Sequence, residues 1–216
     1  MRLILIRHGR TEWNAEARVQ GRTDIPLDAV GRAQAQSIAK RRSSIPLKAI
    51  YTSPLLRAAE TAQEIAAYHA CSVNRIAEMT EINFGAWEGK TAQELEKQYA
   101  ALWQDWNWIL HPETCREMGA ESADDILMRV LNGLDQMLSE QPEDATVALV
   151  SHTMPIKLLV AHLIGLPASK IRALKLANCS YTELELKAEH ADCAQLWVWN
   201  DVSHLEETPA RRGEAL

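Results

Sequence analysis

The feature that most restricts the fold is a repeated alternation of short apolar runs with longer amphipathic segments. Arg2–Ile6 (RLILI) and Thr146–Val150 (TVALV) are strand-length runs of almost wholly apolar residues, which is typical of strands buried on both faces of a sheet. Lys48–Thr52 and Val73–Ala77 are two further strand candidates. Strands that alternate with helices predict an α/β fold, with three α/β/α layers and a mostly parallel central sheet.

The segments between these runs are predicted to be helical. Asp28 is a suitable N-cap for a helix that ends in the Lys-Arg-Arg run 40–42, where cations suit the negative end of the helix dipole. Two late segments, 180–186 and 195–199, alternate polar and apolar residues and predict an antiparallel edge to the sheet. The other predicted helices cover residues 54–68, 91–99, 122–140 and 155–164.

The length predicts one domain, and the composition restricts its surroundings. We expect residues 1–205 to form a single catalytic domain with a small helical insert near 90–120, followed by a flexible polar tail over 206–216. A net charge of −6 argues against nucleic-acid binding, and no apolar stretch is long enough to span a membrane. The four cysteines, at 71, 115, 179 and 193, form no CxxC pair. They favour reduced thiols and therefore a cytoplasmic protein.

Polar residues follow three of the predicted strands directly. Arg7 and His8 follow the first strand, Arg57 lies in the first turn of the helix after the second, and His152 follows the strand at 146–150. In open α/β sheets ligands bind at the carboxyl ends of the strands, so we expect these side chains to meet at one edge. Arginine forks and helix N-termini bind anions, and a cationic pocket keeps histidine neutral and nucleophilic. The pattern predicts phosphoryl transfer on a histidine; alternatively, each histidine only terminates its strand.

Five blocks along the chain carry a resemblance to a known family. They are LIRHGRTEWN (5–14), TSPLLRAAETA (52–62), EINFGAWEG (81–89), GAES (119–122) and VSH (150–152). Together, and in this order, they resemble the histidine phosphatase superfamily, which includes the cofactor-dependent phosphoglycerate mutases and the α-ribazole phosphatases. The blocks span nearly the whole chain, whereas Arg-His-Gly alone is a weak signal.

The resemblance implies a role for each matching residue. His8 would be the nucleophile that forms a phosphohistidine, and Arg7, Arg57 and His152 would hold the phosphoryl oxygens. Glu81 would protonate the leaving oxygen and then accept a proton from the attacking water. Without its flanking block, Glu81 would be interpreted as a solvated loop carboxylate.

Further positions match substrate-binding parts of the family, and one departs from them. Asn14 matches a phosphate contact, and Gln20 and Gly21 match a loop that closes beside it. Residues 153–155 are Thr-Met-Pro, where relatives have glycine after the second histidine. This departure puts the local backbone contact to phosphate in doubt, while the Thr153 hydroxyl offers a substitute.

Two other phosphate-binding motifs fail on spacing. In GAWEGKT (85–91) three residues separate the glycines where a P-loop needs four, and Glu88 would oppose the phosphates. A Cys-x5-Arg motif counted from Cys71 ends on Ala77. The cluster of Trp103, Trp106 and Trp108 either packs internally or lines the substrate's non-phosphate part.

The predicted function is hydrolysis of a small-molecule phosphate monoester without a metal or other cofactor. No HExxH or paired acidic block suggests metal ligands, and a short stretch between Gly89 and Gly119 favours a phosphatase over a mutase. The alternatives are a phosphoglycerate mutase-type transferase and a non-catalytic phosphate-binding protein. Family precedents for the substrate are α-ribazole 5′-phosphate, phosphoserine and glucosyl-3-phosphoglycerate, and analogy suggests a homodimer.

Overall fold

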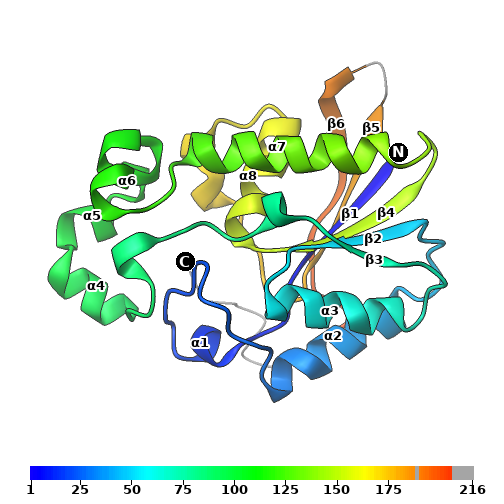
Figure 1. The fold of residues 1–216 in the computed structure, drawn as a ribbon, viewed down its shortest axis with the longest axis horizontal. Coiled ribbons are helices and arrows are strands. Elements are labelled where there is room, and N and C mark those ends of the chain that lie inside the picture. The colour runs from blue at the N-terminus through cyan, green and yellow to red at the C-terminus, as the bar shows by residue number, and fades with distance from the viewer. Residues whose placement is uncertain (188–189, 206–216) are drawn as a thin grey trace.

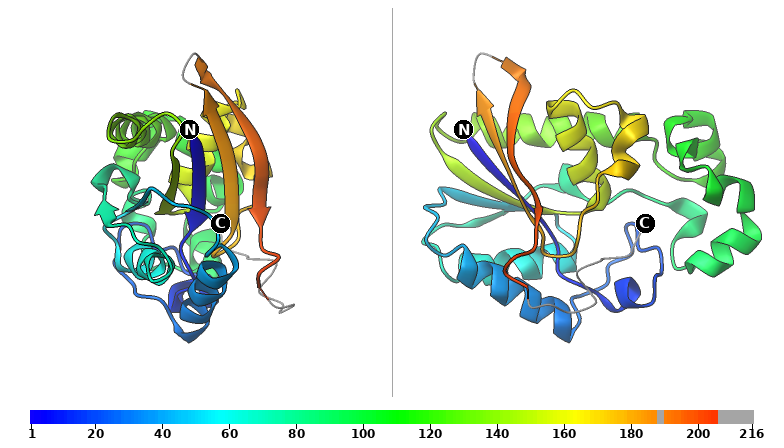
Figure 2. Two further views of the ribbon diagram at one scale, coloured as in Figure 1. Left: turned by 90° about the vertical axis from the view of Figure 1, so that its right-hand side faces the viewer. Right: turned by 180° about the vertical axis from the view of Figure 1, so that it is seen from behind.

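A six-stranded mixed sheet forms the centre of the protein, which we describe from a computed structural model over residues 1–187 and 190–205 (Figure 1). The strand order is β3-β2-β4-β1-β5-β6, and the first four strands are parallel. β5 pairs antiparallel with β1 and β6 antiparallel with β5, so the predicted antiparallel edge is confirmed (Figure 2). The strands are β1 (Arg2–Arg7), β2 (Ala49–Thr52), β3 (Val73–Arg75), β4 (Thr146–Ser151), β5 (Tyr181–Lys187) and β6 (His190–Asp201). The tail predicted over 206–216 lies outside the described residues.

Helices cover both faces of this sheet. Successive side chains of a strand point to opposite faces, so Leu3 and Leu5 join the core beneath α7 (Ala123–Ser139) and α8 (Thr153–Leu163). Ile4 and Ile6 join the opposite core, beneath α2 (Ala29–Arg41) and α3 (Leu56–Ala66). Burial on both faces explains why RLILI is apolar without alternation. The predicted three-layer α/β/α class is confirmed (Figure 1).

Several element boundaries differ from the predictions, and at three of them the structure gives a physical reason. α8 begins at Thr153 rather than Pro155, because proline is tolerated throughout the first helical turn, where its missing N–H would have no intrahelical partner. β3 ends at Arg75 because a short 3₁₀ turn, η1 (Ala77–Met79), follows almost at once. β6 covers 190–201 rather than 195–199, since it pairs with β5 through several register shifts that obscure a regular alternation.

The region between Gly85 and Met118 folds into short helices around a tryptophan. Trp87 is fully buried, and its ring centroid lies 5.8 Å from that of Trp103 and 5.0 Å from that of Trp108. Both rings therefore pack internally, while the side chain of Trp106 lies outside the described part of the structure. The elements here are η2 (Gly85–Trp87), α4 (Ala92–Gln98), α5 (Ala100–Gln104), η3 (Trp106–Leu110) and α6 (Pro112–Met118); α1 (Glu12–Ala15) and η4 (Ala168–Ala173) lie elsewhere.

The predictions about membrane spans and about the cysteines can be compared with the fold. Within residues 1–187 and 190–205, none of the helices has the length and apolar character that crossing a bilayer requires. Cys71, Cys115 and Cys179 are free thiols, and the side chain of Cys193 lies outside the described residues.

Candidate active site

The carboxyl ends of three neighbouring strands bring the candidate residues together. β1 lies beside β4, and β4 beside β2, so the residues that follow them share one edge of the sheet. The His8 N–H donates to the Ser151 carbonyl at 3.0 Å, and the Ser53 N–H donates to the Val150 carbonyl at 3.0 Å. These backbone bonds fix the spacing of the three strand ends before any side chain is considered.

A small cavity of about 40 Å³ opens at this edge. The ring centroid of His152 lies 5.1 Å from that of His8, directly beside this cavity. Sequence reasoning did not select Arg18, Val19, Phe84 and Met154, which also line the cavity. The other predicted site residues all line it: Arg7, His8, Asn14, Gln20, Gly21, Arg57, Glu81 and Thr153.

Hydrogen bonding defines which ring nitrogen of His8 carries the proton. Its Nδ1 lies 2.7 Å from the carbonyl oxygen of Gly9. A carbonyl only accepts hydrogen bonds, so Nδ1 carries the proton and Nε2 presents its lone pair. The neutral imidazole is thus held in the tautomer that nucleophilic attack through Nε2 requires.

The surroundings keep both histidines neutral. Burial lowers the pKa of His8 well below its usual 6.5, and the positive charges of Arg57 and Arg7 lower it further. Burial likewise lowers the pKa of His152, with Arg57 adding to the effect. His152 Nε2 lies 2.8 Å from the Ser53 hydroxyl, and its buried Nδ1 has no hydrogen-bond partner among the described residues.

Two buried arginines supply positive charge to the cavity. Arg7 donates to the Leu176 carbonyl at 2.6 Å, and Arg57 donates to the carbonyls of Thr23 and Gly21 at 2.9 and 2.7 Å. Burial lowers the pKa of each guanidinium to about 10, so both stay charged at neutral pH. The Nε atoms of both are buried without a partner in the described structure. Two such donors beside a histidine lone pair suit a phosphoryl group.

A capping motif orients the amide groups of the cavity. Thr11 caps the short helix α1, and the Asn14 Oδ1 accepts from the Thr11 N–H at 3.2 Å. Gln20 Oε1 accepts from the Thr11 hydroxyl at 2.9 Å. With both oxygens engaged, the NH₂ groups of Asn14 and Gln20 are the donors that remain for a ligand in the cavity.

The loop that carries Gly21 is held by Glu88, which sequence reasoning assigned no role. The Glu88 carboxylate accepts from the N–H groups of Arg22 and Thr23 at 2.9 and 3.0 Å, and from the Phe84 N–H at 3.2 Å. Gly21 has φ +54°, and a Cβ there would collide with the Glu88 carboxylate. This position therefore requires glycine on two grounds.

Glu81 lies at the N-terminus of α8. Its carboxylate accepts from the N–H groups of Thr153 and Met154, both at 3.1 Å, and from its neighbour Ile82 at 3.0 Å. The segment 153–155, which departs from the family pattern, therefore contributes backbone donors to the carboxylate of Glu81. Helix N-termini favour negative charge, so the first turn of α8 fixes this carboxylate at the cavity wall.

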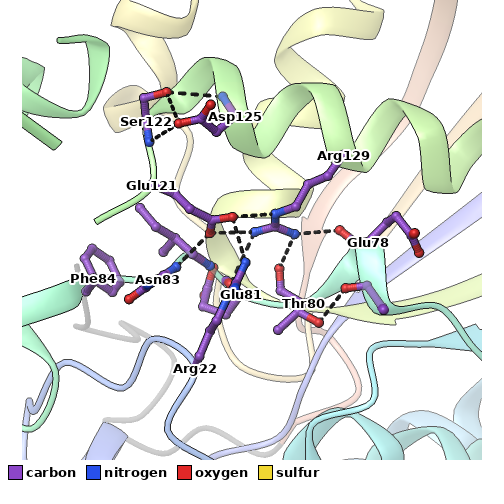
Figure 3. Close-up of polar contacts among 12 residues, drawn as sticks. Arg22, Glu78, Thr80, Glu81, Asn83, Phe84, Glu121, Ser122, Asp125 and Arg129 are labelled. Carbon is purple, nitrogen blue, oxygen red and sulfur yellow. Dashed lines mark hydrogen bonds and ion pairs between the residues drawn. The ribbon is translucent and has the colours of Figure 1, made fainter. Parts of the chain in front are cut away.

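An ion pair between Arg129 and Glu121 holds the segment that carries Glu81 (Figure 3). Arg129, on α7, donates to both oxygens of Glu121 at 3.0 and 3.1 Å. It also donates to three carbonyls of the segment, those of Glu78 at 2.5 Å, Thr80 at 2.6 Å and Glu81 at 3.2 Å.

The Glu121 carboxylate extends this network to the loop at Gly21. It accepts from the Asn83 N–H at 2.8 Å and from Arg22 at 2.7 Å (Figure 3). The block GAES contains Glu121, so the sequence marked this position without showing its partner. Arg129 had no local signal, because its partners lie up to 51 residues away.

Asn178 forms hydrogen bonds with both His8 and Asn14. Its Nδ2 donates to the His8 carbonyl at 3.0 Å and to Asn14 Oδ1 at 3.3 Å. No role was assigned to Asn178 from the sequence. As for metal ligands, no three His, Cys, Asp or Glu side chains among the residues described gather into a group that would hold an ion.

Similar proteins share this architecture over most of their length. The chain is 34% identical to the probable phosphoglycerate mutase GpmB of Salmonella paratyphi A, over 95% of each protein. Its structure resembles the phosphoserine phosphatase of Entamoeba histolytica, with a TM-score of 0.79 and 31% identity over 95% of this chain and 99% of the other. It also resembles a putative α-ribazole-5′-phosphate phosphatase of Escherichia coli, with a TM-score of 0.78 and 28% identity over 93% and 97%.

Residues 3–201 match the histidine phosphatase superfamily (branch 1), which is 199 of the 216 residues. A match of this extent, together with the full-length relative, establishes the assignment that the five sequence blocks predicted. The chain belongs to the histidine phosphatase superfamily.

Proposed function

We propose that this protein is a metal-independent phosphomonoesterase that acts through a phosphohistidine on His8. The observation that carries the proposal is the state of His8: a neutral ring whose Nδ1 donates to Gly9 and whose Nε2 has no hydrogen-bond partner among the described residues, beside two buried arginines. A lone pair on Nε2 next to two guanidinium groups combines a nucleophile with the charge that a transferring phosphoryl group needs. The ligand is a small-molecule phosphate monoester.

In the first half-reaction, His8 Nε2 attacks phosphorus and the bond from phosphorus to the ester oxygen breaks. Glu81, in its carboxylic acid form, gives its proton to the leaving oxygen, and an alcohol departs. Arg7, Arg57 and His152 stabilise the charge that spreads over the phosphoryl oxygens. The Gly9 carbonyl keeps the Nδ1 proton in place and stabilises the positive ring of the phosphohistidine.

In the second half-reaction, water attacks phosphorus and the bond from phosphorus to Nε2 breaks. The Glu81 carboxylate accepts the water's proton, and inorganic phosphate and neutral His8 are released. One carboxyl group thus alternates between acid and base, and it returns to its starting state. Its three backbone hydrogen bonds hold it in one place throughout.

A phosphatase is favoured over a mutase by the structural neighbours. The two solved structures compared above are of proteins named as phosphatases, one of them putative, and their similarity extends over at least 93% of this chain. The competing function is phosphoryl transfer to a second substrate, because one relative is named as a probable phosphoglycerate mutase. Return of the phosphoryl group from 2,3-bisphosphoglycerate faster than its hydrolysis would favour the mutase.

The test is phosphate release from a panel of monoesters in EDTA, from about pH 5 to 8. The panel contains α-ribazole 5′-phosphate, phosphoserine and 3-phosphoglycerate. We expect release to persist despite chelation, and His8→Ala to abolish it. A protein that only binds phosphate would show no release from any member, and its affinity would survive His8→Ala. Acid-labile ³²P on the wild type, absent from His8→Ala, would identify the intermediate.

A further inference from the structure

A buried lysine, one helical turn beyond the α8 residues that line the cavity, has no partner among the described residues. Lys157 on α8 is only 7% exposed, and the described residues offer it neither a hydrogen bond nor an ion pair. Lysine is rarely buried unless it is paired, because an ammonium group loses its hydration there. The mechanism proposed above does not use it.

Helix geometry directs Lys157 towards the cavity. It follows Thr153 by four positions and Met154 by three, so it shares their face of α8, and both of those residues line the cavity. Side chains on a helix lean towards its N-terminus, which is the end of α8 that meets the cavity. Four residues separate Lys157 from Thr153, about 6 Å along the axis, and the long lysine stem spans this rise.

The charges around Lys157 are mainly positive. The pKa of Lys157 is lowered to about 8, mainly by burial and to a smaller extent by the charges of Arg7, Lys175 and Arg172, while Glu81 opposes them. Arg172 and Lys175 are exposed residues on the segment after α8, and Arg7 binds that segment through the Leu176 carbonyl at 2.6 Å. The one opposing carboxylate, Glu81, already accepts three backbone N–H groups.

We propose that Lys157, flanked by Arg172 and Lys175, binds a second anionic group of the substrate. The preferred substrate is then a phosphate monoester that carries a carboxylate or a second phosphate near the ester. This inference rests on the proposed phosphatase function. The cavity of about 40 Å³ is small, so the rest of a substrate has to extend past the phosphoryl site. An anion on the α8 side would supply the partner that Lys157 lacks among the described residues.

The experiment compares matched substrates that differ in one charge. 3-Phosphoglycerate is compared with glycerol 3-phosphate for a carboxylate, and fructose 1,6-bisphosphate with fructose 6-phosphate for a phosphate. We expect the wild type to prefer the more anionic member of at least one pair by about 10- to 100-fold in kcat/KM, as a charge-assisted hydrogen bond would give. Lys157→Met should bring that ratio close to one. The preferred pair identifies the anion.

Lys170→Met is the matched control, since Lys170 is an exposed lysine of η4 on the same side of the chain. It should keep the wild-type ratio. Lys157→Met removes a buried charge and keeps the volume, so we expect it to fold, and its urea unfolding midpoint checks this. Equal rates within both pairs for the wild type, or an unchanged ratio in Lys157→Met, would overturn the inference.

Failure of the proposed function is distinguishable from failure of this inference. If no monoester is hydrolysed, the phosphatase proposal fails. The affinities of the same matched pairs for the wild type and Lys157→Met, measured by calorimetry, still test the anion site. A preference in Kd that disappears in Lys157→Met supports the site without turnover, and equal affinities within both pairs contradict it.

Discussion

Replacement of Arg129 by methionine should destabilise the protein and impair the proton transfer assigned to Glu81. The guanidinium makes five hydrogen bonds, two to Glu121 and three to the carbonyls of Glu78, Thr80 and Glu81 (Figure 3). Methionine retains much of the apolar stem and removes every one of them. Arg129 does not touch the cavity, so its effect on catalysis acts through the position of Glu81.

The expected loss of unfolding free energy depends on how buried the ion pair is and on the partners that Glu121 keeps. The side chains of Arg129 and Glu121 are each 17% exposed, and breaking one partner of a buried pair costs about 3–5 kcal/mol. Glu121 keeps the Asn83 N–H and Arg22, and the pair is not fully dry, so we expect about 2–4 kcal/mol. A displacement of Glu81 by about 1 Å would lower kcat by about 100-fold.

Two assays separate stability from positioning. Urea unfolding gives the free-energy change, and Arg75→Met, an exposed arginine at the end of β3, is the control that should change it little. Rates on p-nitrophenyl phosphate and on an alkyl phosphate isolate the acid, because a nitrophenolate leaves without much help from a proton donor. Loss of folding would lower both rates together, whereas misplaced Glu81 lowers the alkyl rate more.

Glu121→Gln and the double variant complete a thermodynamic cycle. We expect a coupling free energy of about 1–3 kcal/mol between Arg129 and Glu121, since they are in direct contact. The reasoning is refuted if Arg129→Met unfolds within about 1 kcal/mol of the wild type and its two substrate rates keep the wild-type ratio.

Three further predictions follow from the site. Glu81→Gln should slow hydrolysis of an alkyl phosphate by about 100-fold or more and that of p-nitrophenyl phosphate much less; equal losses in the two kcat values would exclude the acid role. Burial and nearby arginines lower the pKa of His152 in the folded state, so the unfolded chain binds more protons below about pH 6.5. As the pH is lowered through this range, the free energy of unfolding should therefore decrease by up to about 1.4 kcal/mol per pH unit for this histidine. Urea curves from pH 7.5 to 5.5 should show a shallower fall for His152→Gln, and parallel curves would contradict this. Gly21→Ala should destabilise the fold by at least about 1 kcal/mol more than Gly119→Ala, because both glycines have positive φ but only a Cβ at Gly21 meets a side chain, that of Glu88; thermal unfolding of both variants compares them.

Much of the site was predictable from short stretches of sequence. Arg7-His8 and Ser151-His152 directly follow apolar runs, and parallel strands in one layer end at a common edge. Arg57 follows from the same rule, because it lies in the first turn of α3, the helix that follows β2. Glu81 was different, because only the resemblance carried by EINFGAWEG selected it.

Helix caps were also predictable from neighbouring residues, whereas the first residue of a helix was harder to predict. Asp28 caps α2 as predicted, through the Gly31 N–H at 2.6 Å, because both groups lie within one turn. Pro155 was a misleading marker for the start of α8, since proline is compatible with several positions of a first turn. The tryptophan cluster left two interpretations open, and packing around Trp87 decided between them for Trp103 and Trp108.

The sequence by itself determined the layered α/β fold and the residues at the strand ends, because strand burial, capping and strand-end position depend on neighbours a few residues apart. Only the tertiary structure decided which groups those residues meet. The hydrogen bonds from α8 to Glu81 join residues more than 70 positions apart. Arg129 on α7 donates to the carbonyls of the segment that carries Glu81. Whether Lys157 finds a partner depends on all the residues that pack around it. Such contacts depend on the three-dimensional path of the chain, and no local pattern records that path.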